Sequence, residues 1–138
     1  MNFKTILTFF LSLAFFCCAK KTANAEQAYE YWAGSKPPND IEVIEGEYYE
    51  SPHFTLEYEL SLKLKSNRKL FNDFVAQNGF VIDSVANQWT KPSELPEWFE
   101  PEIGSVVYCK DPTDKFDRSR YFYNYETGVW YIYETIGM

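Results

Sequence analysis

A regular alternation of apolar and polar residues in the middle of the chain limits the folds open to it. From Phe54 to Lys65, every even position is Phe, Leu or Tyr, and every odd position is polar or charged. Successive side chains of a β-strand point to opposite faces, so this run predicts a strand over 53–65 in a sheet with one solvated face. A helix would spread the same apolar residues around its whole circumference.

A short helix is predicted directly after this strand. Asn67 is a good N-cap, the apolar residues of 70–75 fall on one helical face, and Asn78-Gly79 is a typical stop because glycine accepts the left-handed conformation. The helix is too short to be stable alone, so it must pack on the sheet. We therefore expect one shared core made by Leu56, Leu60, Leu62, Leu70, Phe71 and Phe74.

Further strands are predicted over 41–49, 80–85, 105–110, 119–125 and 129–135. Gly46 is a candidate bulge in the first of these, and Gly128 is expected to take a positive φ in a hairpin that joins the last two. The order is β-β-α-β-loop-β-β-β. It predicts an α+β fold, an antiparallel five- to six-stranded sheet with one helix packed on a face.

The first 25 residues have the layout of a secretory signal: a basic start, an apolar run and Ala23-Asn24-Ala25. We expect cleavage after Ala25, which divides the chain into a signal peptide (1–25), an irregular lead-in (26–40) and a single α+β domain (41–138). The alternative is a lipid anchor on Cys17 or Cys18, at the end of the apolar run. Either form is exported, periplasmic or secreted.

The domain after this leader is acidic. The chain has 20 acidic and 13 basic residues, and without Lys4, Lys20 and Lys21 the segment 26–138 has a formal charge of −10. Such a charge repels nucleic acid and would attract a basic protein. The simpler interpretation is that it keeps an exported protein soluble.

Residue types that carry catalysis or bind metals are scarce. Cys109 is the only cysteine after the leader, so we expect no disulfide and a buried thiol; His53 is the only histidine and is expected to serve a turn. Asp111, Asp114 and Asp117 lack the spacing of a calcium loop, and no zinc site is credible. We therefore expect no cofactor, no metal and no enzymatic activity.

Two pairs of carboxylates lie on neighbouring predicted strands. Glu57 and Glu59 share the polar face of one strand, and Glu45 and Glu47 lie on the other. Paired carboxylates across two strands can form a glycosidase site. We expect instead that they solvate the exposed face of the sheet.

A proline-rich segment between the strands combines acidic and aromatic residues. Because the final hairpin is aromatic on both faces, either the helix and this loop cover its second face, or that face is a recognition surface. We expect some exposure in the loop and predict that its aromatic side chains anchor a partner while its carboxylates steer it. The predicted partner-binding residues are Trp89, Glu94, Glu97, Trp98, Phe99, Glu100 and Glu102.

Together these features predict an exported, non-enzymatic protein-binding domain. In its most concrete form it is an immunity protein or inhibitor that captures a basic protein partner, a toxin or an envelope hydrolase, in the cell envelope. The alternative is an envelope accessory protein that binds a glycan or a partner protein through an exposed aromatic face. A small hydrolase is the third hypothesis, and no motif supports it.

Overall fold

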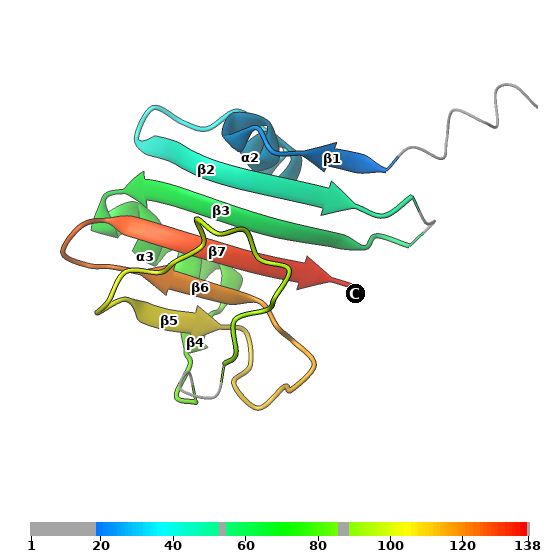
Figure 1. Ribbon diagram of the computed structural model, residues 1–138. Coiled ribbons are helices and arrows are strands. Elements are labelled where there is room, and N and C mark those ends of the chain that lie inside the picture. Colours follow the sequence, from blue (N-terminus) through cyan, green and yellow to red (C-terminus); the bar gives the residue numbers. More distant parts are fainter. Residues whose placement is uncertain (1–18, 53–54, 86–88, 138) are drawn as a thin grey trace, which may run out of the picture.

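Seven strands form one antiparallel sheet in the computed structural model, which describes residues 19–52, 55–85 and 89–137 (Figure 1). The strand order across the sheet is β1-β2-β3-β7-β6-β5-β4, and every neighbouring pair is antiparallel. The elements are β1 (Lys20–Thr22), α2 (Ala25–Ala33), β2 (Ile41–Glu50), β3 (Tyr58–Ser66), α3 (Arg68–Asn78), β4 (Val81–Ile82), β5 (Val106–Cys109), β6 (Arg120–Tyr123) and β7 (Val129–Ile136).

The predicted α+β class is confirmed, but among the described residues the sheet has seven strands rather than five or six, and two helices are present rather than one. The additional strand β1 and the additional helix α2 come from residues assigned to the leader and the lead-in. From β2 onward the order of elements is the predicted one.

Helix α2 corrects the prediction that 26–40 is irregular. The Asn24 side chain accepts a hydrogen bond from the Gln27 backbone at 2.9 Å, and Gly34 ends the helix in the left-handed conformation. Only the part after Gly34 is irregular. Among the described residues, no helix has the length and apolar character needed to cross a membrane.

Strand β3 begins at Tyr58, five residues later than the alternation predicts. Glu50 pairs with Tyr58 across β2 and β3, so the residues between them must reverse the chain, and Ser51 donates to the Glu57 carbonyl at 2.9 Å. Leu56 lies in this connection and is 60% exposed, which corrects its predicted place in the core. His53 and Phe54 lie outside the described residues.

Both helices pack on one face of the sheet, hereafter the helix side. Leu60, Leu62 and Phe71 are fully buried there as predicted, and Leu70 and Phe74 are partly buried against them. Helix α3 has the predicted Asn67 cap and Gly79 end, and its Phe71 stacks on Tyr123 of β6 with ring centroids 4.0 Å apart. This stacking holds α3 over the centre of the sheet.

The predicted bulge in β2 lies between Val43 and Glu45, not at Gly46. Gly46 is buried because α2 crosses the strand at this point. A Cβ there would lie 2.8 Å from the Leu62 side chain and 3.0 Å from Ala28, so only glycine lets the helix approach this closely.

The opposite face of the sheet is covered by the proline-rich loop that crosses β6 and β7 in Figure 1. We call this face the loop side. A second core forms under the loop, so the final hairpin is covered on both faces. The buried residues of this second core are Leu95, Phe99, Phe122, Val129, Tyr131 and Tyr133. The hairpin turn has Gly128 at φ 74°, as predicted.

Candidate functional site

The aromatic residues predicted to anchor a partner mainly close the second core. Phe99 is fully buried, with its ring centroid 5.4 Å from that of Tyr131. Trp89 and Trp98 are partly buried against the same cluster, and the Trp89 indole donates to the Arg118 carbonyl at 3.3 Å. Phe99 is therefore not free to bind a partner unless the loop detaches, which corrects its predicted role. Trp98 keeps a partly exposed surface.

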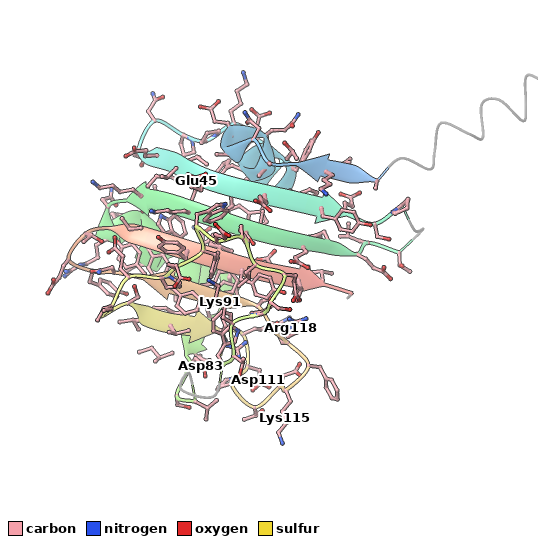
Figure 2. All side chains as sticks on the ribbon, viewed as in Figure 1. Glu45, Asp83, Lys91, Asp111, Lys115 and Arg118 are labelled. Carbon is pink, nitrogen blue, oxygen red and sulfur yellow. The ribbon has the colours of Figure 1, made fainter. Side chains whose placement is uncertain are left out.

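Three of the four loop carboxylates have partners within the protein: two attach the loop to other segments, and one pairs within the loop. Glu94 pairs with Arg118 at 2.8 Å and Glu100 pairs with Lys91 at 2.5 Å. Glu102 accepts hydrogen bonds from the Asn124 side chain at 2.8 Å and the Thr127 hydroxyl at 2.6 Å. Figure 2 shows Lys91 and Arg118 on the loop side of the sheet. Glu97 is exposed and makes no ion pair within the described part of the chain.

The aspartates of the 111–117 turn each accept hydrogen bonds from their own segment. Asp111 accepts from the Thr113 backbone at 2.8 Å, Asp114 from Phe116 at 2.9 Å and Asp117 from Ser119 at 2.9 Å. In 19–52, 55–85 and 89–137, no group of three or more potential ligands could hold a metal ion. The aspartates therefore shape the turn.

Cys109 is fully buried, and burial raises the pKa of its thiol. Asp83 and Arg120 lie near enough for their charges to act on it. A buried thiol with a raised pKa is a poor nucleophile, so Cys109 belongs to the core of the protein.

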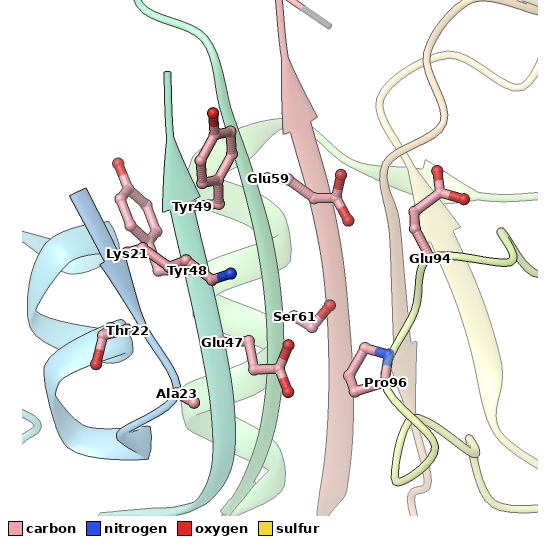
Figure 3. Close-up of a pocket in the computed structure, with 10 residues that line it drawn as sticks. All are labelled: Lys21, Thr22, Ala23, Glu47, Tyr48, Tyr49, Glu59, Ser61, Glu94 and Pro96. Carbon is pink, nitrogen blue, oxygen red and sulfur yellow. The ribbon is translucent and has the colours of Figure 1, made fainter. Parts of the chain in front are cut away.

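The sheet carries an acidic pocket on its loop side, beside the covering loop (Figure 3). Glu47 of β2 and Glu59 and Ser61 of β3 lie on the sheet, and the loop contributes Glu94 and Pro96. Glu47 is the cross-strand partner of Ser61, so Glu47 and Glu59 are diagonal neighbours on one face. The cavity volume is about 150 Å³, and Lys21 of β1 lines it as well.

Burial and neighbouring charges act on the carboxylates of this acidic pocket. Burial is the main cause that raises the pKa of Glu59, and the Glu94 and Glu47 charges add to it, while Arg118 opposes it. The pKa of Glu94 is lowered, chiefly by its own backbone N–H and by Arg118. Glu47 and Glu59 make neither an ion pair nor a side-chain hydrogen bond to any other described residue.

A buried hydroxyl without a partner lies next to the acidic pocket. Tyr133 of β7 is directly opposite Ser61, and its side chain is fully buried. Among described atoms its hydroxyl finds no hydrogen-bond partner. Burial raises the pKa of Tyr133 to about 12, and the charges that act on it are Glu59, Arg118 and Glu94. Tyr133 itself is not among the residues that line the pocket.

Two larger hollows offer less to a ligand. The hollow of about 570 Å³ beside β7 contains Glu134, but that carboxylate already accepts hydrogen bonds from Tyr58, from Tyr121 at 2.5 Å and from Trp32 at 3.1 Å. The hollow of about 300 Å³ lies against the 111–117 turn, whose aspartates serve the turn. The acidic pocket differs from both because two of its carboxylates have no partner in the described chain.

The fold and this pocket define an α+β protein with one two-sided antiparallel sheet and an acidic surface site. Comparison with protein families, with curated proteins and with solved structures gives no match. The functional argument therefore rests on the residues themselves.

Sequence reasoning identified part of the acidic pocket. The alternation of β2 and β3 places Glu47 and Glu59 on one polar face, as expected. The role predicted for them from the sequence, however, was only to solvate that face. Glu94 was assigned to the partner-binding loop. Only the way the loop folds back over β7 brings Glu94 next to Glu59, and no local pattern in the chain encodes that contact.

Proposed function

We propose that this chain is an exported, non-enzymatic protein-binding domain that captures a basic protein partner in the cell envelope. An immunity protein or an inhibitor of a toxin or envelope hydrolase is its most concrete form. The observation that supports this proposal best is the acidic pocket, where Glu47 and Glu59 lie on one face and neither makes an ion pair with another described residue.

Charge on the surrounding surface supports the same proposal. Glu45 pairs in register with Lys63 on the polar face of β2 and β3, and Figure 2 shows it on β2. Glu97 is exposed in the adjoining loop. With a formal charge of −7 for the full chain, long-range attraction would speed the encounter with a basic protein and would weaken in salt. The partner-binding surface we propose is the exposed acidic part of the loop side, without the buried Phe99.

Export remains part of the proposal, and the fold favours processing before Lys20. Cleavage after Ala25 would remove β1, the Asn24 cap of α2 and the Lys21 wall of the acidic pocket. Processing at Cys17 or Cys18 would keep all three. Both cysteines lie outside the described residues. We therefore propose the lipid-anchored form, which was the alternative from sequence.

The other two hypotheses have less support. The aromatic hairpin is covered on both faces, so it offers little exposed aromatic surface for a glycan. Small-molecule and substrate sites usually occupy about 300–1,000 Å³. The acidic pocket of about 150 Å³ is smaller than that range, which favours a contact with one protein side chain over a hydrolase site.

Affinity capture with a matched charge variant tests the proposed function. The domain 19–138 is immobilised and exposed to envelope extract of the producing organism at low and high salt. We expect the parent bait to retain a basic protein at low salt and to release it at high salt. A bait that carries Glu45→Gln, Glu47→Gln and Glu97→Gln should not retain that protein. Equal retention by both baits, or capture of acidic proteins only, would contradict the proposal.

A further inference from the structure

We infer that one end of the sheet, the end at which the described chain begins, rests on the lipid bilayer and inserts the Phe116 side chain into it. Leu56 and Ile136 lie at the same end and add to this contact. The inference rests on the lipid-anchored form proposed above and states how the anchored domain stands on its membrane. The occupant is a lipid surface because of where the chain enters the fold and how few residues separate that point from the anchor.

The strand register places the entry of the chain beside the end of the last strand. Lys20 of β1 pairs with Glu50, Glu50 pairs with Tyr58, and Tyr58 pairs with Ile136. The start of β1, the end of β2, the start of β3 and the end of β7 therefore lie in one row across the sheet. Figure 1 shows the start of β1 and the end of β7 on the same side. We call this the tether end.

The proposed anchor is separated from the tether end by very little chain. Cys17 and Cys18 directly precede Ala19, the first described residue, which is followed by β1. Consecutive Cα atoms are about 3.8 Å apart, so the acylated cysteine lies within about 8 Å of Ala19. An acyl chain in the bilayer holds its cysteine at the membrane surface. The tether end is therefore the part of the domain that the anchor keeps nearest to lipid.

Large apolar side chains are exposed at this end. Phe116 is 93% exposed, Leu56 is 60% exposed and Ile136 is 42% exposed. Phe116 and Ile136 line the same hollow of about 570 Å³, and Leu56 lies close to Gly137, the residue after β7. A single exposed apolar residue is common on a protein surface. Three of them beside a short tether to a bilayer gain free energy by leaving water for lipid.

The charges at the tether end suit a zwitterionic surface. Lys115 precedes Phe116, is exposed and makes no ion pair in the described part of the chain, and Figure 2 shows it in the turn that leads to β6. A lysine can reach lipid phosphate while its apolar neighbour inserts. Asp111 and Asp114 are exposed in the same turn, and an anionic membrane would repel them.

Quenching by brominated lipid tests the contact. The full chain, as the producing cell processes and acylates it, is reconstituted into phosphatidylcholine vesicles with brominated acyl chains. Phe116→Trp places an added indole at the tether end. Ile103→Trp is the matched control, because Ile103 is 101% exposed and precedes β5, whose first residue Val106 pairs with Tyr123 beside the hairpin turn. We expect quenching above that of the parent for Phe116→Trp and none for Ile103→Trp.

Amine labelling of the same vesicles tests the role of Phe116 by a second measurement. In the parent, contact with lipid should shield Lys115 from a water-soluble amine reagent. Phe116→Ser should raise the labelling of Lys115 severalfold, because the turn no longer inserts. Lys36 is exposed in the connection between α2 and β2, and its labelling should be the same in both proteins. Equal labelling of Lys115 in parent and variant would contradict the insertion.

The outcomes separate this inference from the proposed function. Quenching of neither added indole, or of both equally, overturns the inference and leaves the lipid anchor and the capture of a basic protein intact. A dimer of the full chain that Phe116→Ser dissociates would assign the tether end to a second copy and would also overturn it. A product without lipid overturns the inference together with the lipid-anchored form, whereas the salt-dependent capture assay is decided separately.

Discussion

The Arg120 guanidinium donates from Nε to Asp83 Oδ2 at 2.7 Å, and both side chains are buried. Arg120 begins β6, whereas Asp83 follows β4, the edge strand of only two residues. Arg120 also donates from Nη1 to the carbonyls of Asp117 and Ser119 at 2.8 and 2.7 Å. One side chain thus joins the edge of the sheet to the turn before β6.

Loss of Asp83 should destabilise the domain strongly. We expect Asp83→Ala to lower the free energy of unfolding by about 3–5 kcal/mol, because the variant leaves a buried guanidinium without its counter-charge. Urea denaturation of the domain 19–138 measures it. The double variant Asp83→Leu with Arg120→Met removes both charges and should recover most of the loss. A cost below about 1 kcal/mol for Asp83→Ala would mean that the pair is solvated.

Phe99 should behave as a core residue rather than as a binding residue. It is fully buried in the second core, so Phe99→Ala should cost about 3–5 kcal/mol. Truncation of its partly exposed neighbour Trp98 should lower the free energy of unfolding by less, and Glu97→Gln should leave it nearly unchanged. Thermal unfolding of the three variants measures the order. Equal stability of Phe99→Ala and the parent would show that the loop does not pack on the sheet in solution.

The sequence predicts the elements whose signals are local. The alternation of 58–65, the Asn67 cap and the Gly79 end are properties of short segments, and they fix β3 and α3. The residue at which an element begins does not follow from the local pattern alone. The alternation continues through Leu56, but the pairing of Glu50 with Tyr58 forces the chain to turn there.

The N-terminal elements were missed because a second signal overlaps them. Ala23-Asn24-Ala25 is typical of a cleavage site, yet in the fold Asn24 caps α2 and Ala25 begins it. The residues before it pair with β2, a contact that depends on chain segments far apart. The sequence likewise did not show that Glu94 joins Glu47 and Glu59 in the acidic pocket, because Glu94 and Glu59 are 35 positions apart in the printed sequence.

Glu59 should make the domain less stable as pH rises. Its pKa is raised in the folded state, so above its ordinary pKa near 4.5 the folded protein binds more of this proton than the unfolded chain does. Stability from this group is therefore present at low pH and falls as pH rises through the raised value. We expect Glu59→Gln to have a higher melting temperature than the parent at neutral pH, with the difference shrinking toward pH 4.

The comparison of parent and variant isolates this carboxylate from the others in the chain. Glu97→Gln, on an exposed loop position, is the control and should show no such trend. A Glu59→Gln variant that is less stable than the parent at neutral pH would mean that Glu59 has a stabilising partner in solution.

The segment before Glu26 should be needed for full stability. Lys20, Lys21 and Thr22 pair with Glu50, Tyr49 and Tyr48, and Lys20 also lies 3.7 Å from the Glu50 carboxylate. Removal of this strand would leave the long β2 as an open sheet edge. Removal of Asn24 would cost about 0.5–2 kcal/mol through the lost cap alone.

A chain that begins at Glu26 should therefore unfold at lower urea concentration than the chain 19–138, by more than the loss in Asn24→Ala. Amide hydrogen exchange should locate the difference in β2 and in the first turn of α2, because those are the elements that β1 and Asn24 support. Intact mass of the exported protein then tests whether the cell keeps the strand. A product that starts at Cys17 or Cys18 and carries a diacylglyceryl group agrees with the fold. A native product that starts at Glu26 and is as stable as 19–138 would show that β1 is dispensable and would restore cleavage after Ala25.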